Sequence, residues 1–174
     1  EADIFWNHAM LLLIKKFDKK TPIAVYNPHQ WFIMARQEAE SLIWTRLADE
    51  GALMLCLVAG KTDLDKKSVE RMNSLHKDIK SSVAEKALLP STRYINIYGD
   101  ILIEMRIPLE IAEKIDHWFE TADDSPASIS TLQEIIQSTA RIKFTFSNSP
   151  NRARTLQKQI EKNFHIPKKY KTAT

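Results

Sequence analysis

The chain of 174 residues is poor in cysteine and glycine, with one Cys and three Gly. A single cysteine excludes an internal disulfide, and three glycines are too few for a glycine-rich nucleotide loop. No apolar stretch approaches the roughly 20 residues that a membrane-spanning helix needs; the longest are Met10–Ile14 and Ala52–Ala59. Cys56 lies within the second stretch, which predicts a buried, inert thiol and a reducing, cytoplasmic setting.

The start of the chain shows neither a secretory signal nor an initiator methionine. Glu1 and Asp3 stand where a signal peptide has its basic residues. We therefore expect the chain to be a domain fragment of a larger protein.

Common metal and catalytic motifs are also lacking. None of the five histidines has a second His or Cys at metal-ligand spacing. Gly60-Lys61-Thr62 resembles the end of a phosphate-binding loop, but the first glycine of that loop would fall on position 55, which is leucine. These absences favour a non-enzymatic protein that holds no cofactor and no metal.

One weak catalytic candidate is the pair Arg71 and His76, with four residues between them on a predicted helix. This spacing resembles that of HEPN-type ribonucleases, in which histidine acts as acid or base and arginine stabilises phosphate charge. Met72 stands where that family usually has a polar residue, and five helical positions separate the two side chains by about 140°. The alternative is an ordinary solvated arginine and histidine beside the core.

Positive charge is concentrated at the C-terminal end. The net charge is +3, but residues 141–174 hold nine basic residues against one acid, Glu161, so the rest of the chain carries a net charge of −5. A basic end on an acidic body favours a polyanionic partner, either nucleic acid or an acidic protein surface.

Hydrophobic periodicity predicts an α+β fold dominated by five to six helices. A small antiparallel sheet is expected from a β-hairpin at about 93–107, turning at Gly99-Asp100, and a third strand at about 141–147. Ala52–Ala59 is expected to be the central buried helix because it is apolar on every side. The predicted helices are Ile4–Phe17, Trp31–Val58, one that begins at Asp63 or Asp65 and is stopped by Leu89-Pro90, one after Pro108, one from Ser130 or Thr131, and one after Pro150.

The domain organisation expected is one globular domain, residues 1–167, followed by a basic polar tail, residues 168–174. The tail is rich in lysine and lacks an apolar pattern.

The hairpin register suggests a binding surface. A two-residue turn places Arg93 opposite Arg106, and two facing arginines repel unless an anion or a carboxylate lies between them. The alternative is that Glu104 neutralises this face. The nucleic-acid-binding candidates are Arg93, Arg106, Arg141, Lys143, Arg152, Arg154, Lys158 and Lys162.

Three functions remain open. The first is a binding module that contacts nucleic acid or another polyanion through the basic C-terminal strand and helix. The second is a protein–protein adaptor within a larger assembly, using aromatic residues such as Trp6, Trp31 and Trp44. The third is a HEPN-like ribonuclease using Arg71 and His76.

Overall fold

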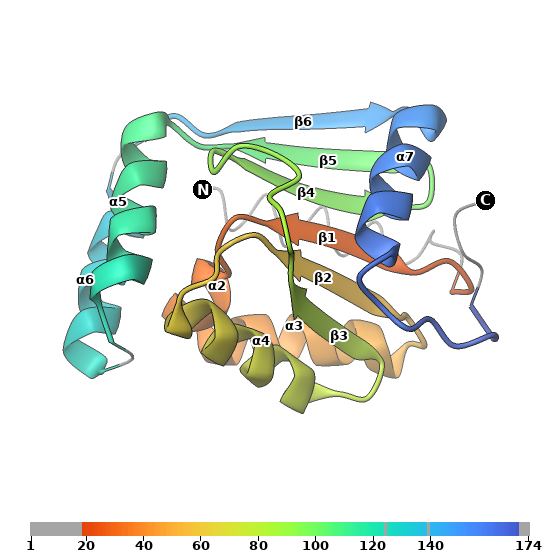
Figure 1. The fold of residues 1–174 in the computed structure, drawn as a ribbon, viewed down its shortest axis with the longest axis horizontal. Coiled ribbons are helices and arrows are strands. Elements are labelled where there is room, and N and C mark those ends of the chain that lie inside the picture. Colours follow the sequence, from red (N-terminus) through yellow and green to blue (C-terminus); the bar gives the residue numbers. More distant parts are fainter. Residues whose placement is uncertain (1–18, 124, 139, 171–174) are drawn as a thin grey trace.

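The computed structural model describes residues 19–123, 125–138 and 140–170 (Figure 1). This part of the chain contains six helices and six strands, and all six strands belong to one sheet. The predicted helix Ile4–Phe17 and Trp6 lie outside the described residues. In chain order the elements are β1 (Ile23–Asn27), α2 (Trp31–Ala35), α3 (Gln37–Asp49), β2 (Met54–Val58), α4 (Asp63–Leu75), β3 (Ile79–Val83), β4 (Arg93–Tyr98), β5 (Ile101–Arg106), α5 (Leu109–Thr121), α6 (Pro126–Gln137), β6 (Lys143–Asn148) and α7 (Pro150–Glu161).

The sheet is mixed, with the strand order β3-β2-β1-β4-β5-β6. β1, β2 and β3 are parallel neighbours, and helices connect each to the next. The chain then returns to the other side of β1, where β4, β5 and β6 continue the sheet in antiparallel pairs. From β1 the chain therefore adds β2 and β3 on one side and then β4, β5 and β6 on the other, so the point where the two series meet lies between β1 and β4.

The predicted fold class was wrong. The protein is α+β, but its sheet has six strands of mixed direction instead of three antiparallel ones. The predicted helix at Ala52–Ala59 is the strand β2. The helix predicted from Asp63 or Asp65 as far as Leu89-Pro90 ends at Leu75, before β3 begins.

Burial on both faces explains the first error. Every residue of β1 and β2 is buried. Strands of this kind read as continuous apolar runs without the alternation of a half-buried strand, and a short run cannot be told from a buried helix by its period. β3 was missed for another reason, since Ile79 and Val83 continue the helical spacing of Met72 and Leu75 beyond the end of α4.

The hairpin and the last strand were correctly predicted. β4 and β5 pair with the expected register, Ile97 opposite Leu102 and Ile95 opposite Glu104, and Gly99 has the positive φ of 60° that the turn requires. β6 pairs with β5 along its whole length.

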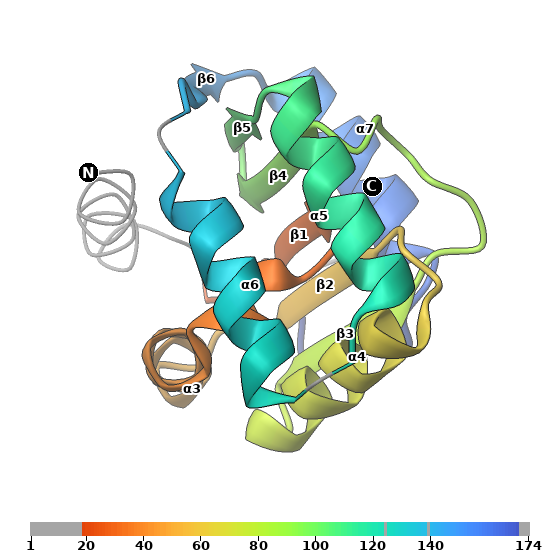
Figure 2. The same cartoon turned by 90° about the vertical axis from the view of Figure 1, so that its left-hand side faces the viewer.

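Two apolar layers cover the two faces of the sheet. One face, with Val25, Cys56 and Ile103, packs against α2 to α6. The other face, with Tyr26, Leu55 and Ile97, packs against α7 and the segment that follows it. Figure 2 shows α3 and α6 on one side of the sheet, α7 on the other, and α5 across the end of the strands.

The C-terminal segment contributes to the second layer. Tyr170 is buried there, next to partly buried Phe164 and Ile166. The division at residue 168 between a domain and a tail stays a prediction. Among the described helices, none combines the length and the apolar character needed to cross a membrane.

A buried histidine connects the loop after β1 to the helices α4 and α5. His29 follows β1; its Nδ1 lies 2.8 Å from Asp65 Oδ1, and its Nε2 lies 3.2 Å from Asp116 Oδ1 on α5. The other oxygen of Asp65 accepts hydrogen bonds from the backbone N–H and the hydroxyl of Thr62, which forms a capping box at the start of α4. The ring stacks on Phe119 at a centroid distance of 4.3 Å.

Gly60 leaves the room that this contact needs. A Cβ atom at Gly60 would overlap both the carboxylate of Asp65 and the ring of His29, and neither group is the free end of a flexible chain. We expect Gly60→Ala to lower the free energy of unfolding by about 2–3 kcal/mol, as overpacking does elsewhere. Gly99→Ala is the comparison, because its Cβ meets nothing within 4 Å and only the positive φ costs about 1 kcal/mol. Urea unfolding of both variants measures the difference, and equal losses would contradict the close packing at Gly60.

Candidate nucleic-acid interface

The centre of the candidate site is Glu104, a buried carboxylate on β5. The residue is 2% exposed and lies on the face of the sheet that carries α7. Its Oε1 accepts a hydrogen bond from Arg106 Nε, and its Oε2 accepts one from Arg152 Nη2 at 2.8 Å. Arg93 Nε lies 3.6 Å from Oε1. Three arginines from β4, β5 and α7 therefore meet at one carboxylate.

Strand register explains why these cations are neighbours. Arg93 is the direct partner of Arg106 across β4 and β5, and Lys143 is the partner of Arg106 across β5 and β6. Side chains that are direct partners lie about 5 Å apart at their Cβ atoms and repel when their charges are alike. Arg152 approaches from the first turns of α7, which begins two residues after β6 ends. We call these four residues, Arg93, Arg106, Lys143 and Arg152, the basic surface.

The environment keeps Glu104 ionised. Burial alone raises the pKa of a carboxyl group, but the hydrogen bonds from Arg106 and Arg152 and the charges of Arg106 and Arg93 act in the opposite direction and outweigh it. The pKa of Glu104 therefore lies below its ordinary value. The carboxylate offsets one positive charge of the basic surface and leaves three.

The arginines retain donors for another anion. A guanidinium group has about five N–H donors, whereas one carboxylate accepts only about four hydrogen bonds in all. The side chains of Arg106 and Arg152 are each 45% exposed, and that of Arg93 is 29% exposed. The alternative from the sequence, that Glu104 neutralises this face, therefore accounts for only one of the four positive charges. The carboxylate also holds three guanidinium groups at the surface in fixed positions.

The other four predicted residues lie around this centre without touching Glu104. Arg141 precedes β6, and its side chain is exposed. Arg154 Nε lies 3.9 Å from Asp100 Oδ1 in the hairpin turn. Lys158 is exposed in the last turn of α7, and Lys162 is the residue that caps its end. They extend the positive charge along β6 and α7 but do not join the arginine cluster.

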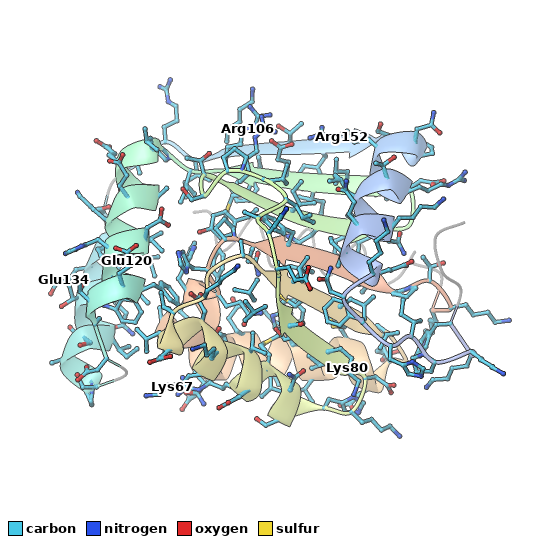
Figure 3. All side chains as sticks on the ribbon, viewed as in Figure 1. Lys67, Lys80, Arg106, Glu120, Glu134 and Arg152 are labelled. Carbon is cyan, nitrogen blue, oxygen red and sulfur yellow. The ribbon has the colours of Figure 1, made fainter. Side chains whose placement is uncertain are left out.

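Acidic and basic side chains are interspersed over the molecule, with ion pairs such as Lys66 with Asp63 on α4 and Arg154 with Asp100 beside the hairpin turn. Figure 3 shows Arg106 near β5 and Arg152 on α7, and it shows Glu120 and Glu134 on α5 and α6. Lys67 and Lys80 lie on α4 and β3, away from the basic surface.

The structure does not bring Arg71 and His76 together. Arg71 Nη1 lies 3.7 Å from Met34 Sδ. His76 caps the end of α4 in an extended conformation, where its Nδ1 accepts a hydrogen bond from the backbone N–H of Asp78. Both residues are described, and no hydrogen bond or ion pair joins them.

Sequence reasoning missed two clusters. It treated His29 as one of five histidines without a metal-ligand partner and Asp65 as a possible first residue of a helix, and it did not single out Gln30. All three lie at or beyond the carboxyl ends of β1 and β2, which is where ligands bind in sheets of this kind. Two apolar runs, one before His29 and one before Gly60, would have indicated this cluster if they had been interpreted as two parallel strands. Within the described ranges no group of three or more His, Cys, Asp or Glu residues has a metal-binding arrangement.

The role of Glu104 in the fold can be tested by charge removal. Its folded pKa lies below the ordinary value of 4.5, so the carboxylate stabilises the fold above that pH, and the contribution is lost as the pH falls through the folded pKa. We expect Glu104→Gln to lower the free energy of unfolding at pH 7 by about 1–3 kcal/mol.

The difference between this variant and the unmodified chain should shrink when the pH is lowered from 7 to below the pKa of Glu104 in the folded protein, which itself lies below 4.5. Glu110→Gln on the exposed start of α5 is the matched control and should change little. Urea unfolding at both pH values measures the effect; a loss for Glu104→Gln that is independent of pH would contradict the ionised carboxylate.

Comparison with known proteins gives no relative: no family model matches the chain, and neither a curated protein nor a solved structure is significantly similar to it.

Proposed function

We propose that the chain is a non-enzymatic module of a reducing, cytoplasmic setting that binds the phosphate backbone of nucleic acid through the basic surface. The observation that carries the proposal is the ordering of three guanidinium groups by one buried carboxylate. Arg93, Arg106 and Arg152 keep free donors beside Lys143 on a solvent-facing part of the sheet.

Guanidinium groups suit this partner. They bind phosphate through two parallel N–H···O bonds, and they are more weakly hydrated than ammonium groups. Side chains that are already ordered lose less conformational entropy when a ligand binds. Glu104 supplies that order, because it contacts Arg106 and Arg152 through separate oxygens.

Binding of this kind is independent of base sequence. Contacts to phosphate position a protein on nucleic acid, whereas sequence is read from base edges by elements that enter a groove. The cations of the basic surface come from three strands and the first turns of one helix, so they form a broad contact. Arg141, Arg154, Lys158 and Lys162 lengthen it along β6 and α7. An acidic protein surface is the other partner that these cations fit.

A salt titration tests the proposal. Because Glu104 leaves three net positive charges, about three phosphates should be neutralised, and the logarithm of the association constant should fall with the logarithm of salt concentration at a slope of about −2 to −3. This amounts to a loss of roughly 20- to 50-fold between 50 and 200 mM salt. Fluorescence anisotropy with a labelled 20-nucleotide DNA of mixed sequence, single-stranded or duplex, measures both quantities. No binding of either form at low salt would overturn the proposal.

A pair of double variants locates the contact. Arg106→Gln with Lys143→Gln removes two charges from the basic surface and should make the slope shallower by about 1.5–2. Arg46→Gln with Lys67→Gln removes two exposed charges from α3 and α4 and should leave the slope nearly unchanged. Equal effects of the two pairs would show that net charge alone drives binding and would overturn the assignment of the site.

A further inference from the structure

The two edge strands of the sheet differ in how they are protected. β3 forms one edge and β6 forms the other (Figure 1). At the β3 edge, the side-chain amide of Asn73 on α4 takes the place of a neighbouring strand. Its Nδ2 donates a hydrogen bond to the carbonyl oxygen of Ser81 at 3.0 Å, and its Oδ1 accepts one from the N–H of Ser81 at 2.7 Å. The exposed Lys80 adds a charge, and both features discourage a further strand from joining β3.

β6 carries few of the features that discourage pairing. It pairs with β5 residue by residue without a bulge, it contains no proline, and its one charged residue, Lys143, is at its first position. Four of its six residues are exposed, whereas every residue of β1 and β2 is buried. Phe146, a large apolar side chain, is 45% exposed. An exposed edge strand of this composition is a template for another strand.

The register shows which backbone groups lie at this edge. The N–H of Ser149 donates to the carbonyl oxygen of Asp100 at 3.1 Å, so Ser149 belongs to the residues that exchange hydrogen bonds with the β5 side. In antiparallel pairs such residues alternate with residues whose N–H and C=O point the other way. Phe144, Phe146 and Asn148 therefore direct their backbone groups away from β5, to the outer side of the sheet.

The sequence of β6 is complementary to a second copy of itself. Phe144-Thr145-Phe146 is the same in both chain directions, as a two-fold axis through Thr145 requires. Such an axis places Phe144 of each copy opposite the partner's Phe146, and these are the residues whose backbone groups point outward. Two aromatic pairs thus form across the new boundary on one face of the sheet, and two threonines face each other on the other face. Both kinds of cross-strand pair are stabilising.

The charges of β6 allow the same register. Lys143 lies opposite the partner's Ser147, and four residues of strand, about 13 Å, separate it along the strand from the partner's Lys143. This distance exceeds the screening length of about 8–10 Å at ordinary salt concentrations. A shift that puts Phe146 opposite itself would leave Phe144 opposite Asn148 and lose one aromatic pair. A shift that puts Phe144 opposite itself would halve the separation of the two lysines.

We propose that two copies of this chain pair through β6, antiparallel and about a two-fold axis at Thr145, to form one continuous sheet with six strands from each copy. α7 follows β6 but packs back over β5, β1 and β2, away from this edge. The axis is perpendicular to the sheet, so the two basic surfaces lie on the same face of the dimer. The pairing itself rests on the edge strand and holds whether or not the basic surface binds nucleic acid.

The unmodified chain tests the pairing first. Sedimentation equilibrium between about 1 µM and about 1 mM should show the mass rising from 20.1 kDa to twice that value. Amide hydrogen exchange should locate the contact. The amide protons of Phe144 and Phe146 should exchange more slowly as the dimer forms, whereas that of Thr145, which points to β5, should change much less.

Two variants of opposite charge test the register. Thr145→Lys and Thr145→Glu each place like charges directly opposite each other at the two-fold axis, so each should raise the dissociation constant of the dimer by about tenfold. A mixture of the two should form a mixed dimer at least as tight as the unmodified one, because lysine then faces glutamate. Circular dichroism confirms that each variant is folded.

Thr155 provides the matched control. It is exposed on α7, and Thr155→Lys and Thr155→Glu make the same changes of charge away from the edge of the sheet. Neither should alter the dissociation constant by more than about twofold.

Three results would overturn the proposal. The first is an unmodified chain that stays monomeric over the whole range of concentrations, which would leave β6 to a strand of a different protein. The second is a dimer in which the amide protons of Phe144 and Phe146 keep the exchange rates of the monomer. The third is a mixture of Thr145→Lys and Thr145→Glu that associates no better than either variant alone.

Discussion

The antiparallel half of this molecule depends on one buried carboxylate. β4, β5 and β6 bring Arg93, Arg106 and Lys143 side by side, and like charges at such positions repel. Glu104 lies among them and contacts arginines from two strands and from α7. Removing one partner from a buried ion pair is costlier than replacing the whole arrangement with apolar residues. The same carboxylate thus permits the pairing of the strands, attaches α7 and orders the surface to which we assign binding.

The parallel half is held together differently. β1 and β2 are buried on both faces, so their stability comes from apolar contact, and their polar residues gather beyond the carboxyl ends of the strands. There His29 connects the loop after β1 to α4 and α5 through two aspartates, and Gly60 leaves space for that contact.

The sequence predicted those parts of the fold in which local signals suffice. Gly99-Asp100 specified the hairpin turn, and the turn specified the register that places Arg93 opposite Arg106. The parallel strands could not be recognised in this way, because their partners lie far apart in the chain and burial on both faces removes the alternating pattern. For the same reason Glu104 was recognised only as a neutralising residue. Its contact with Arg152 depends on how α7 packs on the sheet, and the orientation of Gln30 depends on contacts with β2 and β3.

The position of the basic surface follows from the layers of the fold. α7 packs on β1, β2 and β5 through Ala153 and Ile160, and over β5 and β6 the side chains of Arg106 and Lys143 remain exposed. The cations there lie on an apolar sheet, whose dielectric constant is lower than that of water. Because their charges are less screened at such a surface, an approaching phosphate is attracted more strongly. The opposite face is covered by α2, α5 and α6, which enclose a mostly apolar cavity whose lining includes one arginine and one glutamate, Arg36 and Glu40. One sheet can therefore offer a charged surface on one side and a neutral cavity on the other, because alternate residues of β4 and β5 point in opposite directions.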